Sequence, residues 1–348
     1  MTVKRLGFFT RLLDDASAGE RYRLAAEQII HAEAQGFDSA WVAQHHFHEQ
    51  EGGLPSPFPF LSYVAALTSR IRLGLGVITL PMEHPIRVAE DAVVTDLLSG
   101  GRLEVGFGTG ATPASYEAFG FQAEERHRVY AEYLKVVLDA WRGTALGHDE
   151  NRLYPSGSHL IDRAWQATFS VSGGERAGRA GDGLMLSRTQ PRSPDRPQAT
   201  LSELQEPIID RYLETLPPGR QPRILGSRSL FVVDSRREAL HYAEIGLNHA
   251  ADRFEANGHR FAGRSLEDLI RGMDVHVGTP DEVIESLAAD TALARSTDIV
   301  FQVHSVDPPH PLILRSIELT AEKVAPALGW SGRNRPAVAA EKRIASAR

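Results

Sequence analysis

The sequence predicts an α/β fold, a (β/α)8 barrel with insertions. Eight short apolar runs, helix-like segments between them, and a length of 348 residues that suits a single α/β barrel lead to this prediction. The runs are rich in Val, Ile, Leu and Phe, which is typical of strands buried on both faces of a parallel sheet. They span residues 6–10, 39–43, 71–80, 103–107, 168–172, 183–186, 230–233 and 298–303.

Helical periodicity separates these runs. The first helix is the clearest, because apolar residues from Tyr22 to Ala32 recur at helical spacing and Gly36 suits the position just beyond a helix. Proline at the start of a later segment, Pro85, is typical of a helix N-terminus. The later predicted helices span residues 57–69, 85–98, 124–141, 203–214, 236–245, 280–293 and 312–328.

Three stretches interrupt the alternation and are expected to be insertions, at about residues 143–167, 187–200 and 248–272. The first is polar and glycine-rich, and the third is irregular or helical. The second contains three prolines and follows a predicted strand, so it is either a lid or a static surface connection. We therefore expect one domain over residues 1–330, followed by a basic, disordered tail at 331–348.

Composition limits the classes of function. The formal charge of -7, from 38 basic and 45 acidic residues, gives no basic footprint for nucleic acid. No cysteine is present, which excludes disulfides, a thiol nucleophile and thiolate metal sites, and fits a cytoplasmic protein. No signal peptide is expected before the first strand, and no apolar run is as long as a membrane span.

Histidines follow the second predicted strand, in Trp41-Val42-Ala43-Gln44-His45-His46-Phe47. At the catalytic end of a barrel strand they would serve as acid or base near neutral pH, or else bond to neighbouring strands. A metal site is a further interpretation. It would use His46, His48 and Glu49, with His304 and Asp307 as possible later ligands.

Two glycine-rich segments suggest ligand contacts. The turn at Ser172-Gly173-Gly174 precedes a helix-like segment, where free N–H groups attract phosphate, although a plain capped turn has the same pattern. Gly106, Gly108 and Gly110 alternate at a strand end. They either let a flat ring approach the backbone or meet a packing constraint. His304, which ends the last strand, is expected to face the same pocket or to bond within its loop.

Several motifs in one order resemble the bacterial-luciferase-like flavin monooxygenase family, over about residues 6–328. The most informative is Leu80-Pro81-Met82-Glu83-His84-Pro85-Ile86-Arg87-Val88-Ala89-Glu90-Asp91, a proline-bounded loop leading into an acid-bearing helix. The others are Gln44-His45-His46-Phe47, Ser99-Gly100-Gly101-Arg102, the Ser172 turn and Val277-Gly278-Thr279-Pro280-Asp281-Glu282-Val283.

The resemblance implies a luciferase-like barrel and assigns roles to particular residues. His45 matches the catalytic histidine of the family. Gly76-Val77 matches a place where the family often has a non-prolyl cis peptide, which forms a bulge against the flavin ring. Thr79 and Gly108 are expected near the isoalloxazine.

The phosphate assignment also comes from the resemblance. Ser172, Gly173 and Gly174 match the phosphate turn, while Thr109 replaces a phosphate-binding arginine for which Arg188 is a positional substitute. The chain differs from luciferase itself at four positions, which counts against light emission. They are Gly108 for a reactive cysteine, Thr109 for that arginine, Ser115 for an aspartate near the ring and Gln44 for a glutamate.

The implied activity is a flavin-dependent monooxygenase that uses reduced FMN and O₂, through a C4a-hydroperoxide, to oxygenate an aldehyde, alkane-type or similar small substrate. A separate NAD(P)H:flavin reductase would supply the reduced FMN, because the chain shows no nicotinamide-binding fingerprint. The alternatives are an oxidoreductase using the deazaflavin F420, a metal-dependent barrel hydrolase and a non-catalytic flavin-binding protein. A homodimer is expected by analogy.

Overall fold

Short apolar segments form the strands of a closed parallel barrel, which confirms the predicted fold class. The computed structural model describes residues 4–110, 113–193, 195–256 and 260–330. In these residues the barrel strands follow the order β1-β2-β3-β4-β5-β6-β7-β9, and β9 pairs with β1 to close the ring. They are β1 (Arg5–Thr10), β2 (Ser39–Val42), β3 (Arg72–Thr79), β4 (Leu103–Gly108), β5 (Ala164–Ala167), β6 (Gly183–Leu186), β7 (Ile224–Val232) and β9 (Asp298–Gln302).

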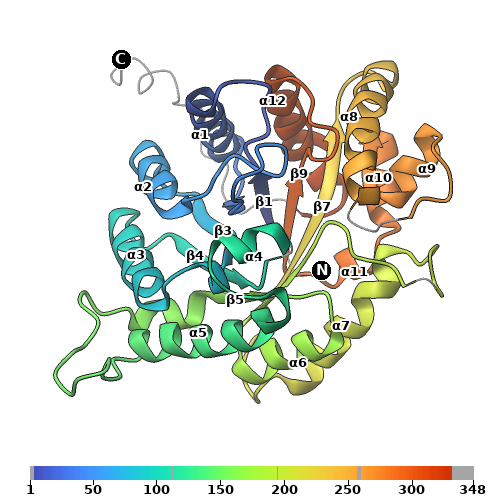
Figure 1. Cartoon of the computed structure of the whole chain (residues 1–348). Helices are drawn as coiled ribbons and strands as arrows, with labels where there is room; N and C mark the ends of the chain where they lie inside the picture. Colours follow the sequence, from blue (N-terminus) through green and yellow to red (C-terminus); the bar gives the residue numbers. More distant parts are fainter. Residues whose placement is uncertain (1–3, 111–112, 194, 257–259, 331–348) are drawn as a thin grey trace.

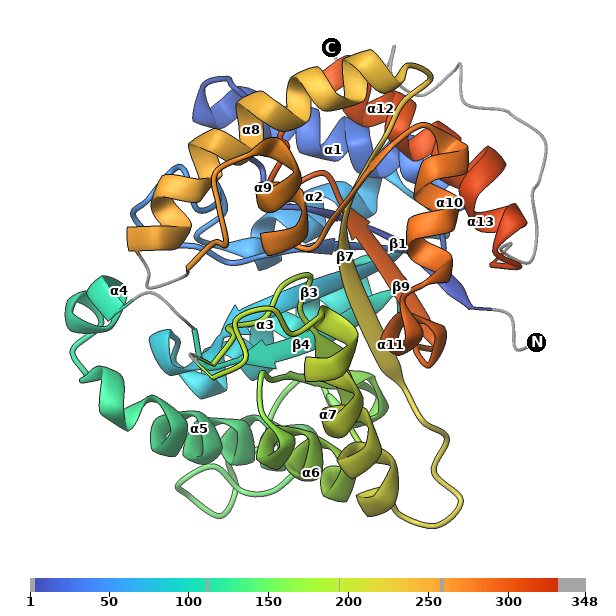
Figure 2. The ribbon, with the colours of Figure 1, turned by 90° about the vertical axis from the view of Figure 1, so that its right-hand side faces the viewer.

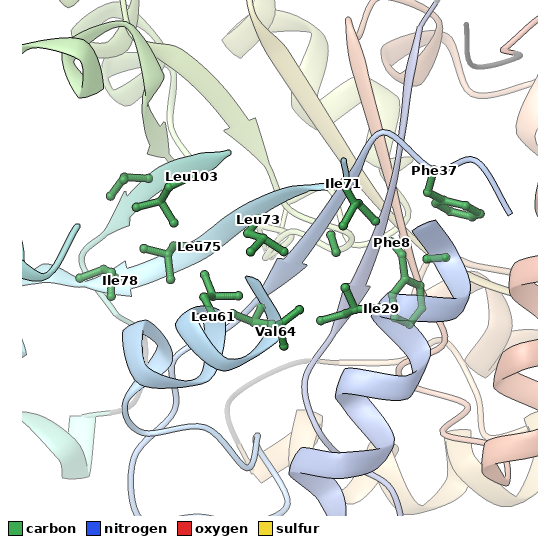
Figure 3. Packing of buried hydrophobic residues seen from close by; sticks show 14 of the residues in the cluster. Phe8, Ile29, Phe37, Leu61, Val64, Ile71, Leu73, Leu75, Ile78 and Leu103 are labelled. Atoms are coloured by element: carbon green, nitrogen blue, oxygen red, sulfur yellow. The ribbon is translucent and has the colours of Figure 1, made fainter. Parts of the chain in front are cut away.

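Helices surround the barrel (Figure 1) and bury the outward faces of its strands. Phe8 and Leu73 of the strands pack with Ile29 and Leu61 of the first two helices (Figure 3). None of the described helices has the length and apolar character needed to cross a membrane. The longer helices are α1 (Ala18–Ala34), α2 (Pro57–Leu67), α3 (Pro85–Leu98), α5 (Arg126–Trp141), α6 (Val171–Ala180), α7 (Leu201–Thr215), α8 (Arg236–Ala256), α10 (Pro280–Ala288) and α12 (His310–Leu319).

Large side chains fill the barrel interior. The indoles of Trp41 and Trp165 meet edge to face with ring centroids 5.8 Å apart. Glycine on the neighbouring strands makes room for them. A Cβ at Gly74 would lie 2.2 Å from Trp41 Cε3, and one at Gly183 would lie 2.1 Å from Trp165 Cε3. The interior is therefore a packed core rather than a channel.

The predicted strand at 168–172 is wrong. The fifth strand, β5, ends at Ala167, and α6 begins at Val171. Ser170 explains the change, because its Oγ accepts a hydrogen bond from the Gly173 N–H at 3.2 Å and so caps a helix start. The predicted strand at 230–233 is only the end of the longer β7. An additional strand that was not predicted, β8 (Val275–Gly278), pairs with β7 outside the ring.

The predicted helices are present, with different bounds. Gly36 has a φ of 88°, as expected just beyond α1, whereas the predicted helix at 280–293 is two helices, α10 and α11 (Thr291–Ala294). The described residues of 187–200 contain no helix or strand, and 248–272 comprises the end of α8 and α9 (Leu266–Gly272). The first insertion runs through a 3-10 helix at Ser158–Arg163 into β5. The predicted tail at 331–348 lies outside the described residues.

Candidate active site at the C-terminal mouth of the barrel

The carboxyl ends of the strands form one mouth of the barrel. It lies on the side to which the arrows of β3 and β4 point, where α4 (Pro113–Ala118) also lies (Figure 2). Strand side chains alternate between the outer core and the interior, so the next interior position beyond a strand end stands at the mouth. On β1, Phe9 fills the interior and Arg11 follows. On β2, Ala43 fills the interior and His45 follows.

A bulge in β3 forms the floor of the mouth. The Gly76–Val77 peptide bond is cis, as the resemblance implies, and both residues are half-buried. The register between β3 and β4 shifts at this point. The amide of Gln44 fixes the end of the bulge. Its Oε1 accepts from the Thr79 N–H at 2.8 Å, and its Nε2 donates to a carboxylate oxygen of Glu83 at 2.5 Å.

The alternating glycines of β4 meet protein atoms, which supports the packing interpretation for that strand. A Cβ at Gly106 would lie 2.2 Å from the Leu75 carbonyl oxygen, and one at Gly108 would lie 2.6 Å from Val77 Cγ2. Gly108 thus seats the Val77 side chain of the bulge. Thr79 is buried at the same end and packs against Gly110.

The predicted phosphate turn is the first turn of α6. Gly173 and Gly174 are buried, and both of their N–H groups bond to Ser170. Ser172 is exposed, with its Oγ 3.2 Å from Ser170 Oγ. The N-terminus of α6 therefore offers the N–H groups of residues 171 and 172, together with two hydroxyls, to an anion.

His45 lies in the opposite part of the mouth. Arg11 Nη2 donates to His45 Nε2 at 3.0 Å, so that nitrogen accepts and the ring proton sits on Nδ1. His45 Nδ1 lies 3.9 Å from a carboxylate oxygen of Glu51. The pKa of His45 is held well below its ordinary value, first by burial and then by the charge of Arg11. His45 is therefore a neutral imidazole at neutral pH.

His304 lies beside His45, and its positive charge, when it titrates, acts on that ring. His304 is buried and its Nδ1–H donates to a carboxylate oxygen of Asp307 at 2.6 Å. Burial lowers the pKa of His304 to about 3, against the opposing effect of Asp307. The sequence left two predictions for His304, a place at the pocket or a bond within its loop. In the structure His304 lines the hollow beside Arg11, and it also bonds to Asp307 within its loop.

Arg188 lies at the same side of the mouth. Its Nη1 donates to Ser229 Oγ at 3.1 Å, and the ring of Phe254 lies 5.8 Å from the guanidinium carbon. Burial lowers the pKa of Arg188 to about 9, with a further contribution from the charge of Arg11. The contacts of Arg188 are thus with β7 and α8, and none is with the described residues of α6.

Buried polar atoms without a partner gather at this mouth. Of the seven such side-chain atoms in the described residues, five follow or end barrel strands. Because buried polar groups are normally hydrogen-bonded, their concentration here marks a place for ligand or water. They are Arg11 Nε, His46 Nε2, Gln190 Oε1, Gln302 Oε1 and Ser305 Oγ.

The alternative metal ligands do not come together. His46 packs its ring against Phe119, with centroids 4.7 Å apart, while His48 and Glu49 are exposed. Across the described ranges, no group of three or more His, Asp or Glu side chains is placed to hold a metal ion.

Three residues at the mouth were missed by sequence reasoning: Arg11, Ser229 and Gln302. Gln302 donates to Ser227 on β7 at 3.3 Å, next to the Arg188–Ser229 contact. The alternation of side chains between the two faces of a strand could have predicted Arg11. Arg11 lies two residues beyond the interior Phe9, just as His45 lies two residues beyond the interior Ala43.

Comparison with known proteins decides the family. The luciferase-like monooxygenase family model matches residues 6–296. The chain belongs to this family. A relative within it, 4-hydroxyprotoasukamycin monooxygenase of Streptomyces nodosus subsp. asukaensis, is 29% identical over 320 residues, 85% of this chain and 84% of its own length. The monooxygenase RslO1 from Streptomyces bottropensis superposes with a TM-score of 0.76 at 25% identity, covering 93% of this chain and 99% of that one.

Relatives of this luciferase-like chain differ in cofactor. The oxygenase component of a flavin-dependent trigonelline monooxygenase from Acinetobacter baylyi is 30% identical over 38% of this chain and 37% of its own. An F420-dependent glucose-6-phosphate dehydrogenase from Kineococcus radiotolerans is 29% identical over 48% and 55%. An FMN complex of a Pseudomonas putida 3,6-diketocamphane monooxygenase has the same fold, with a TM-score of 0.72 over 93% and 99% of the two chains at 18% identity.

Proposed function

We propose that this protein is the oxygenase component of a two-component monooxygenase, which uses reduced FMN and O₂ to oxygenate a small organic substrate such as an aldehyde or an alkane-type compound. The observation that carries the proposal is the concentration of unpartnered buried polar atoms at the mouth of a luciferase-like barrel, beside the half-buried β3 bulge. When bound, reduced FMN supplies two electrons, so that one atom of O₂ enters the substrate and the other leaves as water.

The residues of the mouth fit a flavin. Val77, which packs on the buried Gly108, presents a small apolar surface where a ring can lie against the β3 bulge, with Thr79 beside it. Ser172 and the first N–H groups of α6, of which Gly173 and Gly174 form the buried part, would hold the phosphate.

His45 would move the proton that oxygen insertion requires. Its neutral ring carries a proton on Nδ1, toward Glu51, and its Nε2 accepts from Arg11. A neutral imidazole can take a proton from a reacting group and return it, and the lowered pKa of His45 favours the return. Arg11 fixes the tautomer, so it is a positioning residue for His45.

The loop at 187–200 would close the mouth and exclude water. Gln190 Nε2 donates to the Phe169 carbonyl at 3.0 Å, and Arg192 pairs with Asp274 at 2.5 Å. The loop therefore contacts both the segment that precedes α6 and the residue that precedes β8. Protection of the loop from proteolysis by FMN would support a moving lid, and unchanged cleavage would identify a static connection.

An NAD(P)H:flavin reductase would be the functional partner, in the cytoplasm where such reductants are made. The protein itself would be a homodimer through α2 and α3, whose outer faces expose large apolar side chains. Sedimentation of the wild type and of Leu98→Glu tests the dimer, which the charged variant should dissociate. The exposed fractions are 50% for Tyr63, 45% for Val94, 56% for Leu97 and 64% for Leu98.

The decisive experiment mixes the anaerobic protein and reduced FMN with oxygenated buffer and follows the absorbance of oxidised flavin. Oxidised FMN should return much later than it does without protein, because a closed mouth protects the reacting flavin. A return as fast as in free solution would contradict the monooxygenase proposal. Anaerobic hydride transfer with F420 is then the test of the alternative cofactor.

A further inference from the structure

Arg188 is a buried cation that has no carboxylate partner among the described residues. The residue is 6% exposed, and its contacts are one hydroxyl, Ser229 Oγ, and the ring of Phe254. No carboxylate of the described residues lies within 4.0 Å of its guanidinium. Buried charges in proteins are normally paired or bound to a ligand, because an isolated ion is costly in a low-dielectric interior. The described residues therefore leave the charge of the Arg188 guanidinium without a neutralising anion.

Arg228 is a second buried arginine of this barrel, and it differs from Arg188 in having a carboxylate partner. Arg228, on the outward face of β7, is fully buried and pairs with the carboxylate of Asp290 at 2.5 Å. It also donates to Gln205 Oε1 at 3.0 Å. The difference between Arg228 and Arg188 is therefore not burial but the missing carboxylate.

Arg11 brings a second guanidinium to the region. Its charge contributes to the lowered pKa of Arg188, and burial lowers its own pKa to about 10. Its Nε is buried without a partner, while its Nη2 donates to His45 and to the Glu51 carbonyl. The carboxylate of Asp307 acts on both arginines but bonds to His304 instead, and Arg253 adds another positive charge.

A hollow that is open to solvent lies beside Arg11. On the barrel side it is lined by Thr10, Gln302 and His304. On its outer side the carboxylate of Asp14 accepts from Gln28 Nε2 at 3.1 Å. The hollow therefore exposes the Arg11 side of the mouth to solvent.

We infer that Arg11 and Arg188 form a subsite for the anionic group of the organic substrate, a carboxylate or another oxyacid. Guanidinium groups bind such groups through paired, charge-assisted hydrogen bonds. Of the carboxylates that act on the two arginines, Asp307 bonds to His304, Asp274 pairs with Arg192, and Glu51 lies 3.9 Å from His45 Nδ1. This inference rests on the proposed function only in assigning the anion to the substrate. The flavin phosphate is the other possible source of the same chemistry, and the test separates the two.

The test is calorimetric titration of the flavin-free full chain with benzoate and octanoate, and with benzamide and octanamide as neutral counterparts. The variants are Arg188→Met and Arg11→Met. The matched control is Arg223→Met, which removes a guanidinium that lies over Trp165 and donates to the Ala164 carbonyl, away from the mouth. FMN and riboflavin titrations of the same proteins report whether the phosphate is involved.

The inference predicts that at least one acid binds more tightly than its amide. That preference should fall about 10- to 100-fold in the two mouth variants and not in Arg223→Met. Arg188→Met without ligand should melt no lower than the wild type, because it removes an unpaired buried charge. This last result would not be expected of a merely structural arginine.

Two results would overturn the inference. Equal binding of acids and amides, or an acid preference that survives both variants, would show that no such subsite exists. A loss of FMN affinity in Arg188→Met, with riboflavin binding unchanged, would assign the arginine to the flavin phosphate. None of these readouts needs oxygen, so failure of the oxygen reaction would count against the proposed function alone.

Discussion

On the side of β3 and β4, the barrel mouth presents Val77 and Gly108, whereas on the side of β1, β2 and β9 it presents Arg11, His45 and His304. Both sets stand near or just beyond the carboxyl ends of strands in one ring. The first half is small and apolar and suits a flat ring, and the second carries charge and titratable groups. The side chains at the carboxyl ends of different strands can thus give one barrel two separate functions. Under the proposed function, one half of the mouth binds the cofactor and the other half binds anions and transfers protons.

The largest effect is expected from His45→Ala, which removes the proton-transfer group from the polar half only. Turnover of oxygenated product should fall about 10²- to 10⁴-fold, the usual contribution of a general acid–base, while the FMN dissociation constant stays the same. The measurement pairs product formation with a flavin titration. His46→Ala is the control, because His46 packs on Phe119 instead. Equal losses in the two variants would remove His45 from its proposed role.

Gly108→Ala tests the packing of the apolar half of the mouth. Its Cβ would lie 2.6 Å from Val77 Cγ2, so the free energy of unfolding should fall by about 1–3 kcal/mol, as overpacked cores do. FMN affinity should fall as well, because Val77 must shift at the bulge. Urea unfolding and flavin titration measure the two effects. Gly19→Ala in α1, where no atom lies within 4 Å, should not destabilise. Similar unfolding of both variants would argue against this packing contact.

Ser172→Ala tests the phosphate end of the apolar half. Loss of one hydrogen bond to the charged phosphate, about 1.5–3 kcal/mol, should weaken FMN binding roughly 10- to 100-fold. Riboflavin, which has no phosphate, should bind the variant and the wild type equally. If both flavins lose affinity together, Ser172 acts on the ring or on α6 itself rather than on phosphate.

The smallest effect at neutral pH is expected for Arg11→Met, measured as kcat at saturating substrate. Burial and Arg11 depress the pKa of His45, so its neutral form persists as the pH falls below the ordinary histidine range. Without the cation this pKa rises, and the acid limb of the kcat profile should move to higher pH. A limb that stays in place would mean that another group controls it.

The halves of the mouth also differed in how far the sequence predicted them. His45 was predicted because β2 is a strongly apolar run that ends in a motif. The floor at Gly76–Val77 came from the family resemblance, and the cis bond is confirmed. Arg11 was missed because no motif marks the end of β1, although the alternation along that strand points to this position.

Strand errors have a related cause. Polar residues that serve the site or the outer layer interrupt β7 at Ser227-Arg228-Ser229, so only its apolar end was predicted. The short β5, with Trp165 and Gln166 between alanines, lacks a β-branched run. The segment that has such residues, 168–172, starts a helix because of Ser170. Local propensity fails where tertiary contacts at the mouth decide the residue type.

Trp41 and Trp165 fill the barrel interior below the mouth, where their indoles meet edge to face. Under the proposed function, we therefore expect flavin and organic substrate to enter and leave by the C-terminal mouth. Steady-state kinetics and product inhibition would test whether the two bind in a fixed order.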